Sequence, residues 1–189
     1  AFNRIAFSAA HVVANPLSAR DPSDGPDLDW DATLAYRRHL LGLGLGVAEA
    51  MDTAQRGMGL DWNGALTLIR HTLEGTRDIP GALVFSGCGT DQLEAAEARS
   101  LDDVRRAYDE QLDAIQRLGG RLIVMASRAL VRVARSPDDY VAMYRHVLSQ
   151  AEQPVILHWL GEMFDPALDG YWGTADFDRA MTTCLDVIR

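Results

Sequence analysis

A histidine, a carboxylate or a hydroxyl group stands just past the end of each of five short apolar runs in this sequence. If these runs are parallel strands of a barrel, their carboxyl ends form one mouth, which is where such folds build their sites. His158 is the most informative of these residues, because an imidazole with an unperturbed pKa of about 6.5 both gives and takes protons near neutrality. The other residues in such positions are His11, Asp52 with Thr53, Ser86 with Gly87, Ser127 with Arg128, and Glu162 with Asp165.

Glu49 lies within the second apolar run instead of past its end. We expect its side chain to face the barrel interior, where a carboxylate is costly unless it is paired. Glu49 is therefore either functional or held in a salt bridge, and Arg128 is the expected partner.

Structural explanations stand beside the functional ones. A buried histidine that is hydrogen-bonded for packing reasons is the alternative for His158, and an ordinary loop position is the alternative for His11. The glycine-rich segment from Ser86 to Gly89 also fits a simple tight connection between a strand and a helix.

The runs that must position these residues alternate with amphipathic, capped segments. We expect strands at residues 4–10, 45–51, 82–86, 121–126 and 154–160. A long turn-rich segment separates the first run from the first helix. The helices are expected at 30–43 behind Asp29, at 62–77 behind Asp61, from Ser100 to Gly119-Gly120, from Ser136-Pro137 to about Ala151, and from Ala175 onward.

Continuous apolar strands that each precede a helix predict an α/β fold with a parallel sheet covered by helices. An open five-stranded sheet of the flavodoxin type fits the same pattern. Against it, no glycine-rich phosphate fingerprint follows the first run, and the loop there is long. A complete (β/α)8 TIM barrel needs about 250 residues. We therefore expect residues 1–189 to be the N-terminal portion of a single barrel domain, truncated before strand six.

Composition excludes several function classes. The net charge of −9 disfavours binding to nucleic-acid phosphates. No apolar stretch approaches the roughly 18 residues of a membrane span, and the first ten residues lack a signal-peptide pattern, so we expect a cytoplasmic protein. The separation of Cys88 and Cys184 suggests neither a disulfide framework nor a zinc site, and we expect no cofactor. All 18 basic residues are arginine, so a mechanism that needs lysine must take it from outside this chain.

Three motifs resemble the dihydrodipicolinate synthase and N-acetylneuraminate lyase superfamily of class I aldolases. Residues 154–158 are similar to its fifth strand, with His158 in place of a tyrosine. Residues 52–55 stand where those enzymes carry Thr-Thr-Gly-Glu, and residues 86–89 resemble their glycine-rich turn after strand three. Residues 48–57 and 158–166 are similar to a bacterial dihydrodipicolinate-synthase-like branch, domain of unknown function 993. The resemblance spans nearly the whole chain.

The resemblance implies a lyase or aldolase that forms a Schiff base between a strand-six lysine and a small oxo acid or sugar-derived substrate. It implies proton relay by His158 with Thr53. Asp52 replaces the first threonine and would repel a substrate carboxylate, so the substrate lacks that group or meets Arg128. The lysine would lie beyond this chain, and the 189 residues alone are expected to be inactive. Substrate contacts are expected at Asp52, Glu49, His11, Ser86, Gly87 and Arg128.

Two other functions stay open. A metal-dependent barrel enzyme would use His11, Glu49, Asp52, His158 and Glu162, because histidine and carboxylate groups are usual metal ligands, although their spacing has no signature. A barrel that binds a ligand without catalysis is the third possibility. The expected partner is a small molecule, not nucleic acid or a membrane, and a homo-oligomer of the full-length protein is left open.

Overall fold

The computed structural model describes residues 4–21 and 25–189. Residues 1–3, at the start of the chain, and 22–24, in the turn-rich segment, lie outside the described residues. By internal packing the chain divides into two compact units, residues 1–87 with 115–121 and residues 88–114 with 122–189.

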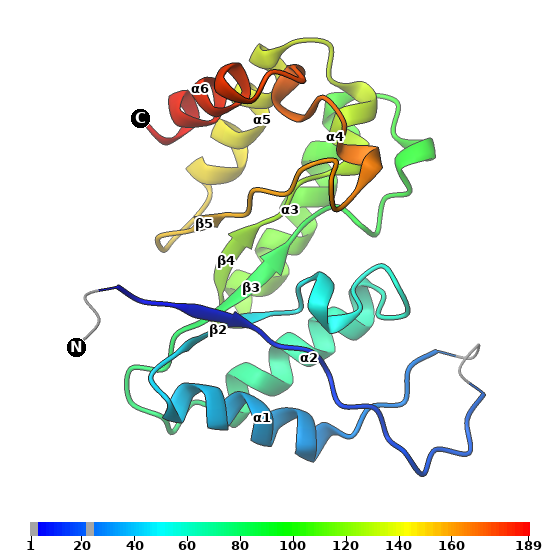
Figure 1. Ribbon diagram of the computed structural model, residues 1–189, viewed down its shortest axis with the longest axis vertical. Helices are drawn as coiled ribbons and strands as arrows, with labels where there is room; N and C mark the ends of the chain where they lie inside the picture. Colours follow the sequence, from blue (N-terminus) through cyan, green and yellow to red (C-terminus); the bar gives the residue numbers. More distant parts are fainter. Residues whose placement is uncertain (1–3, 22–24) are drawn as a thin grey trace. The chain divides into compact units, whose positions relative to one another are not determined.

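The strands follow one another in chain order in one sheet, β1-β2-β3-β4-β5 (Figure 1). The pairs β1–β2, β2–β3 and β4–β5 are parallel. This confirms the expected order of a barrel's first five units. The flavodoxin-type order is wrong, because β2 lies between β1 and β3 instead of outside β1. The strands are β1 (Phe7–Ala9), β2 (Gly46–Glu49), β3 (Val84–Cys88), β4 (Arg121–Val124) and β5 (Ile156–Leu157).

All five strands differ from their expected bounds. β1, β2 and β4 lie within the expected residues 4–10, 45–51 and 121–126 but are shorter. β3 begins and ends two residues later than residues 82–86, so Gly87 and Cys88 lie within the strand and not in the following loop. β5 covers only Ile156–Leu157 instead of residues 154–160. Pro154 cannot donate a ladder hydrogen bond, which explains the late start of β5.

Four of the long helices begin at the expected caps, because short polar side chains there satisfy backbone N–H groups that the first helical turn leaves free. The last helix begins at Phe177 behind Asp176, two residues later than the expected Ala175. The Asp29 carboxylate accepts a hydrogen bond from the N–H of Ala32 at 2.9 Å. Asp61 accepts from the N–H of Gly64 at 2.8 Å. The helices are α1 (Trp30–Gly42), α2 (Trp62–Gly75), α3 (Leu101–Arg117), α5 (Pro137–Ser149) and α6 (Phe177–Ile188).

A short helix, α4 (Arg128–Val133), was not expected from the sequence. Its six residues are too few to reveal a helical period, and the Ser127 side chain caps it by accepting from the N–H of Leu130 at 3.0 Å. No helix of the described part of the chain is long and apolar enough to cross a membrane.

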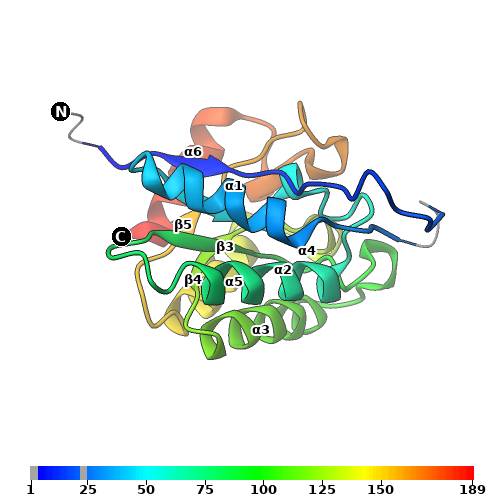
Figure 2. The same ribbon diagram turned by 90° about the horizontal axis from the view of Figure 1, so that it is seen from below.

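The first unit packs α1 and α2 against β2 (Figure 2). Val47 and Val84, partners in the β2–β3 register, lie in a core with Leu40 and Leu41 of α1. Because strand side chains alternate between the two faces of a sheet, this core defines the helix-facing side of β2 and β3.

The second unit has an aromatic core. Tyr140 and Tyr144 of α5 pack against Tyr171 and Trp172, and the Trp172 ring stacks on Tyr144 at a centroid distance of 4.5 Å. Gly173 passes so close to Pro137 that a Cβ atom there would lie 2.7 Å from the proline nitrogen. The turn before α6 is thus held against the start of α5, and α5 and α6 lie side by side (Figure 1).

Candidate functional site

The turn that follows β2 holds two of the expected site residues. Asp52 and Thr53 stand on a single 3-10 turn, Asp52–Ala54, where the N–H of Ala54 donates to the carbonyl of Met51 at 2.8 Å. Ala50 and Gln55 flank the turn with left-handed backbones, φ 52° and 65°. Asp52 is half-buried and Thr53 is exposed. The sequence therefore correctly located a polar turn at the carboxyl end of β2.

Glu49 does not face the barrel interior, so that expectation is wrong. It follows Val47 by two residues and lies on the same, helix-facing side of the sheet. Arg37 of α1 donates to both carboxylate oxygens, at 2.8 and 2.9 Å, and Thr72 of α2 donates to Oε2 at 2.6 Å. The side chains of Glu49 and Arg37 have no exposed surface. The salt-bridge partner is thus Arg37, not Arg128.

Ser86 pairs in register with Glu49 and shares its side of the sheet. Its hydroxyl is buried and has no hydrogen-bond partner among the described residues. Gly87, the next residue, turns its carbonyl to a neighbouring arginine, Arg56.

Arg56 was not expected from the sequence and is the buried cation at the ends of β2 and β3. Its guanidinium donates to the carbonyl of Gly87 at 2.5 Å and to that of Ala50 at 3.2 Å. It also lies over the ring of Trp62, 5.3 Å from the centroid. These contacts tie the turn after β2 to both strands. In the sequence, the only feature that pointed to Arg56 was its position directly after the motif at residues 52–55.

His11 lies past β1 with its side chain exposed. Its ring stacks on that of Tyr36 at 4.9 Å, and Nδ1 lies 3.0 Å from the carbonyl oxygen of Val12. Nothing in the described contacts of His11 brings it to the turn at residues 52–54.

In the second unit, His158 continues the ladder of β5 by one residue. Its backbone N–H donates to the carbonyl of Val124 at 3.0 Å. The residue is half-buried, and Nδ1 is a buried atom with no hydrogen-bond partner in the described part of the chain. A histidine held for structural reasons normally satisfies its buried nitrogens.

Arg128 stands at the start of α4 with its side chain 61% exposed. Its Nε donates to Asp165 Oδ2 at 2.6 Å, and Asp165 also accepts from the N–H of Ala167 at 3.1 Å. The ion pair joins α4 to the loop after β5.

A buried hydroxyl chain runs behind the end of β4. The Ser127 hydroxyl lies 2.6 Å from that of Thr90, and the Ser127 N–H donates to the Tyr171 hydroxyl at 3.1 Å. Tyr171 in turn lies 3.0 Å from the hydroxyl of Tyr144. Burial raises the pKa of the Tyr144 and Tyr171 phenols, so both are neutral donors and acceptors near neutrality.

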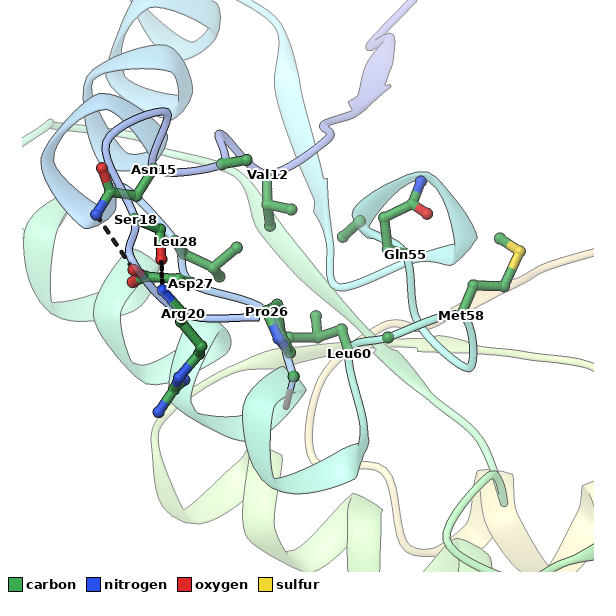
Figure 3. Close-up of a pocket in the computed structure, with 14 residues that line it drawn as sticks. Val12, Asn15, Ser18, Arg20, Pro26, Asp27, Leu28, Gln55, Met58 and Leu60 are labelled. Carbon is green, nitrogen blue, oxygen red and sulfur yellow. Dashed lines mark hydrogen bonds between the residues drawn. The ribbon is translucent and has the colours of Figure 1, made fainter. Parts of the chain in front are cut away.

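The loops after β1 and β2 enclose a pocket of about 320 Å³ within the first unit (Figure 3). Ala54 and Gln55 bring the turn after β2 into its wall, whereas Asp52 and Thr53 are not among its lining residues. No group of three or more His, Cys, Asp or Glu side chains in residues 4–21 and 25–189 is placed to hold a metal ion.

A family model described as Protein of unknown function (DUF993) matches residues 1–189. The chain belongs to this family. A comparison with curated proteins found no match. The family assignment agrees with the motifs at residues 48–57 and 158–166.

Solved structures with a similar fold are enzymes of the dihydrodipicolinate synthase family. YagE, a prophage protein of that family from E. coli K12 in complex with pyruvate, matches with a TM-score of 0.63 and 15% identity over 92% of this chain and 51% of its own. Dihydrodipicolinate synthase from Oceanobacillus iheyensis matches with a TM-score of 0.58 and 14% identity over 96% and 57%. The Acinetobacter baumannii enzyme, complexed with pyruvate, matches with a TM-score of 0.55 and 13% identity over 82% and 45%.

These likenesses show the fold. The DUF993 chain has the architecture of the first five β/α units of a (β/α)8 barrel, and it spans about half the length of the structures that it matches.

Proposed function

We propose that the protein containing this chain is a Schiff-base lyase or aldolase that acts on a small oxo acid or sugar-derived substrate. His158 carries the proposal. It stands at the carboxyl end of β5, where resembling enzymes have a proton-relaying tyrosine, and its buried Nδ1 has no structural partner among the described residues. An unpartnered ring nitrogen leaves the imidazole with a proton donor or acceptor that the fold does not use.

In the proposed reaction a lysine amine adds to the substrate carbonyl, and the adduct loses water to form an iminium ion. His158 gives a proton to the departing hydroxyl group and takes one back in the later carbon–carbon step, with Thr53 assisting. The iminium accepts the electron pair of the bond that breaks. This chain has no lysine, so the amine comes from outside residues 1–189.

Among the other expected contacts, Asp52 limits which substrates are possible in this proposal. Its carboxylate repels a substrate carboxylate nearby. The substrate therefore has no carboxylate beside Asp52, or its carboxylate binds Arg128 instead. His11 and Gly87 are proposed as further contacts, whereas Ser86 lies buried on the helix-facing side of the sheet with Glu49 and is not retained as one. Glu49 is saturated by Arg37, Thr72 and its own chain, so we assign it a role in holding β2 and the helices together.

Borohydride trapping on the full-length protein tests the proposal. With pyruvate as the probe, we expect a stable reduced adduct on one lysine, detected by mass spectrometry. His158→Phe should lower kcat by about 10²- to 10⁴-fold, the usual contribution of a general acid–base group, while adduct formation survives in part. His146→Phe, at a histidine of α5, is the matched control. Absence of the adduct, with activity lost on adding a chelator, would favour the metal-dependent alternative.

A further inference from the structure

The pocket after β1 and β2 has walls that the fold already holds in place. The loop after β1 is closed at its stem by an antiparallel bridge between Ala14 and Leu28, and the N–H of Asp29 donates to the carbonyl of Val13 at 2.9 Å. The loop after β2 is closed by a bridge between Arg56 and Leu60. Hydrogen bonds that fix the ends of the two loops lower the cost of ordering the chain when a ligand binds.

Most of the lining is apolar. Leu28, Ala54 and Leu60 of the lining are buried, and Val12 lies between Leu28 and Gln55 (Figure 3). Met58 lies on the opposite side from Asn15 and Asp27, near Gln55, and is 65% exposed. A volume of about 320 Å³ is at the lower end of the range for small-molecule sites, about 300–1,000 Å³.

Most of the polar lining residues, Asn15, Ser18, Arg20 and Asp27, lie on one side of the pocket, and Gln55 lies on the other (Figure 3). Asn15 Nδ2 donates to Asp27 Oδ2 at 3.2 Å, and both residues are half-buried. Arg20 is exposed and its side chain extends away from Val12 and Leu60 (Figure 3). Of the two charged residues in the lining, Arg20 is exposed and Asp27 is half-buried, so the Asp27 carboxylate is the less solvated charge. It favours a hydrogen-bond donor and disfavours an anion.

We propose that this pocket binds an apolar substituent of the substrate that ends in an uncharged hydrogen-bond donor such as a hydroxyl group. The inference rests on the proposed function, which assigns Thr53 to the reaction, and Ala54, the next residue, belongs to the pocket wall. The substrate is then larger than pyruvate. Its apolar chain fills the space between Val12, Leu28 and Leu60, and its hydroxyl donates to Asp27.

Methyl NMR on the full-length protein, with 1-hexanol as the probe, tests the pocket. We expect 1-hexanol to shift the methyl signals of Val12, Leu28 and Leu60 in a saturable way. Sodium hexanoate, with the same chain length, should bind more weakly because Asp27 repels its carboxylate. Equal binding of hexanoate would overturn the assignment of the polar end, and the absence of shifts at these methyl groups would overturn the pocket itself.

Two variants and a control make the test specific. Val12→Phe adds four carbon atoms to the pocket wall and should weaken 1-hexanol binding by at least about tenfold, since a misfit of a single methylene already costs that much. Met58→Glu places a charge at an exposed wall, where it does not endanger folding, and should also weaken binding. Leu17→Phe introduces the same ring at an exposed position of the first loop outside the lining, and should leave binding unchanged. An equal effect of Leu17→Phe would contradict the proposal.

Pyruvate trapping on the same preparation separates the two proposals. Saturable binding of 1-hexanol without a trapped adduct would support the pocket and reject the Schiff-base function. A trapped adduct without 1-hexanol binding would support the function and reject the pocket.

Discussion

The buried pair of Glu49 and Arg37 links β2 to α1, and Thr72 extends the link to α2. Both charges are desolvated, so each is stable only because the other is present. The position of Glu49 near the end of a strand suggested catalysis, but its buried pairing with Arg37 shows that this carboxylate stabilises the fold.

Replacing Glu49 by Ala should therefore destabilise the protein strongly. Removal of one partner from a buried ion pair leaves an uncompensated charge, which costs about 3–5 kcal/mol. Urea unfolding of the full-length protein would measure the loss. Asp31→Ala, at an exposed position in the first turn of α1, is the control and should change the free energy of unfolding by less than about 0.5 kcal/mol. A loss for Glu49→Ala as small as that of the control would mean that the pair is not desolvated in solution.

The buried phenols of Tyr108, Tyr144 and Tyr171 predict a loss of stability at alkaline pH. Burial is the main cause that raises the pKa of each, above an unfolded value of about 10. The unfolded chain therefore loses these protons first. Stability is complete below about pH 10 and falls as the pH rises toward the native pKa values. Phenolate absorbance and circular dichroism, followed together, should show these tyrosines ionising as the protein unfolds. Full ionisation with native circular dichroism would contradict their burial.

At the scale of the elements, Gly46 decides how β1 and β2 pack. The rings of Phe7 and Phe85 meet edge to face at a centroid distance of 5.0 Å, and Phe7 lies over the backbone of Gly46. A Cβ atom at Gly46 would overlap the Phe7 ring. The glycine thus allows an aromatic contact between two strands that are not neighbours.

Gly46→Ala should cost roughly 1–3 kcal/mol, because the Phe7 ring must move and loses its contact with Phe85. A double-mutant cycle in urea is the appropriate measurement. On a Phe7→Ala background the same glycine substitution should cost much less. Additive effects of the two changes would show that Phe7 does not lie over Gly46.

For the whole molecule, exposed apolar side chains occur in both units. Met163, Phe164, Phe177 and Ile188 of the second unit expose 88%, 78%, 63% and 61% of their surface. β1 and β5 are the outer strands of the sheet, and outer strands pair readily with other chains. Exposed apolar side chains and outer strands both favour association with other protein.

The 189-residue chain made by itself should therefore bind a hydrophobic dye and self-associate. Dye fluorescence and sedimentation at several concentrations would measure both. Replacing Met163 and Phe164 by Gln should reduce dye binding without lowering stability, since both side chains are exposed. A monomer that unfolds cooperatively and binds no dye would contradict the prediction.

Local chemistry explains why the order of elements was predictable from the sequence. Asp29, Asp61 and Ser136 are caps whose effect depends on residues two or three positions away, so each helix start could be identified without the fold. The apolar runs located all five strands but did not fix their ends. Where a strand ends depends on which residues pair with the neighbouring strand, and the sequence alone does not give that pairing. That is why β3 is shifted by two residues and β5 is short.

The sequence by itself determined the parallel α/β pattern, the family resemblance and the absence of lysine from this chain. Only the tertiary structure decided that Glu49 faces the helices, that Arg56 joins the ends of β2 and β3, and that two loops enclose a pocket. The physical reason is the same in each case. Side-chain direction in a strand reverses with every residue, and partners such as Arg37 and Thr72, 12 and 23 residues from Glu49, meet it only after the sheet and helices have packed.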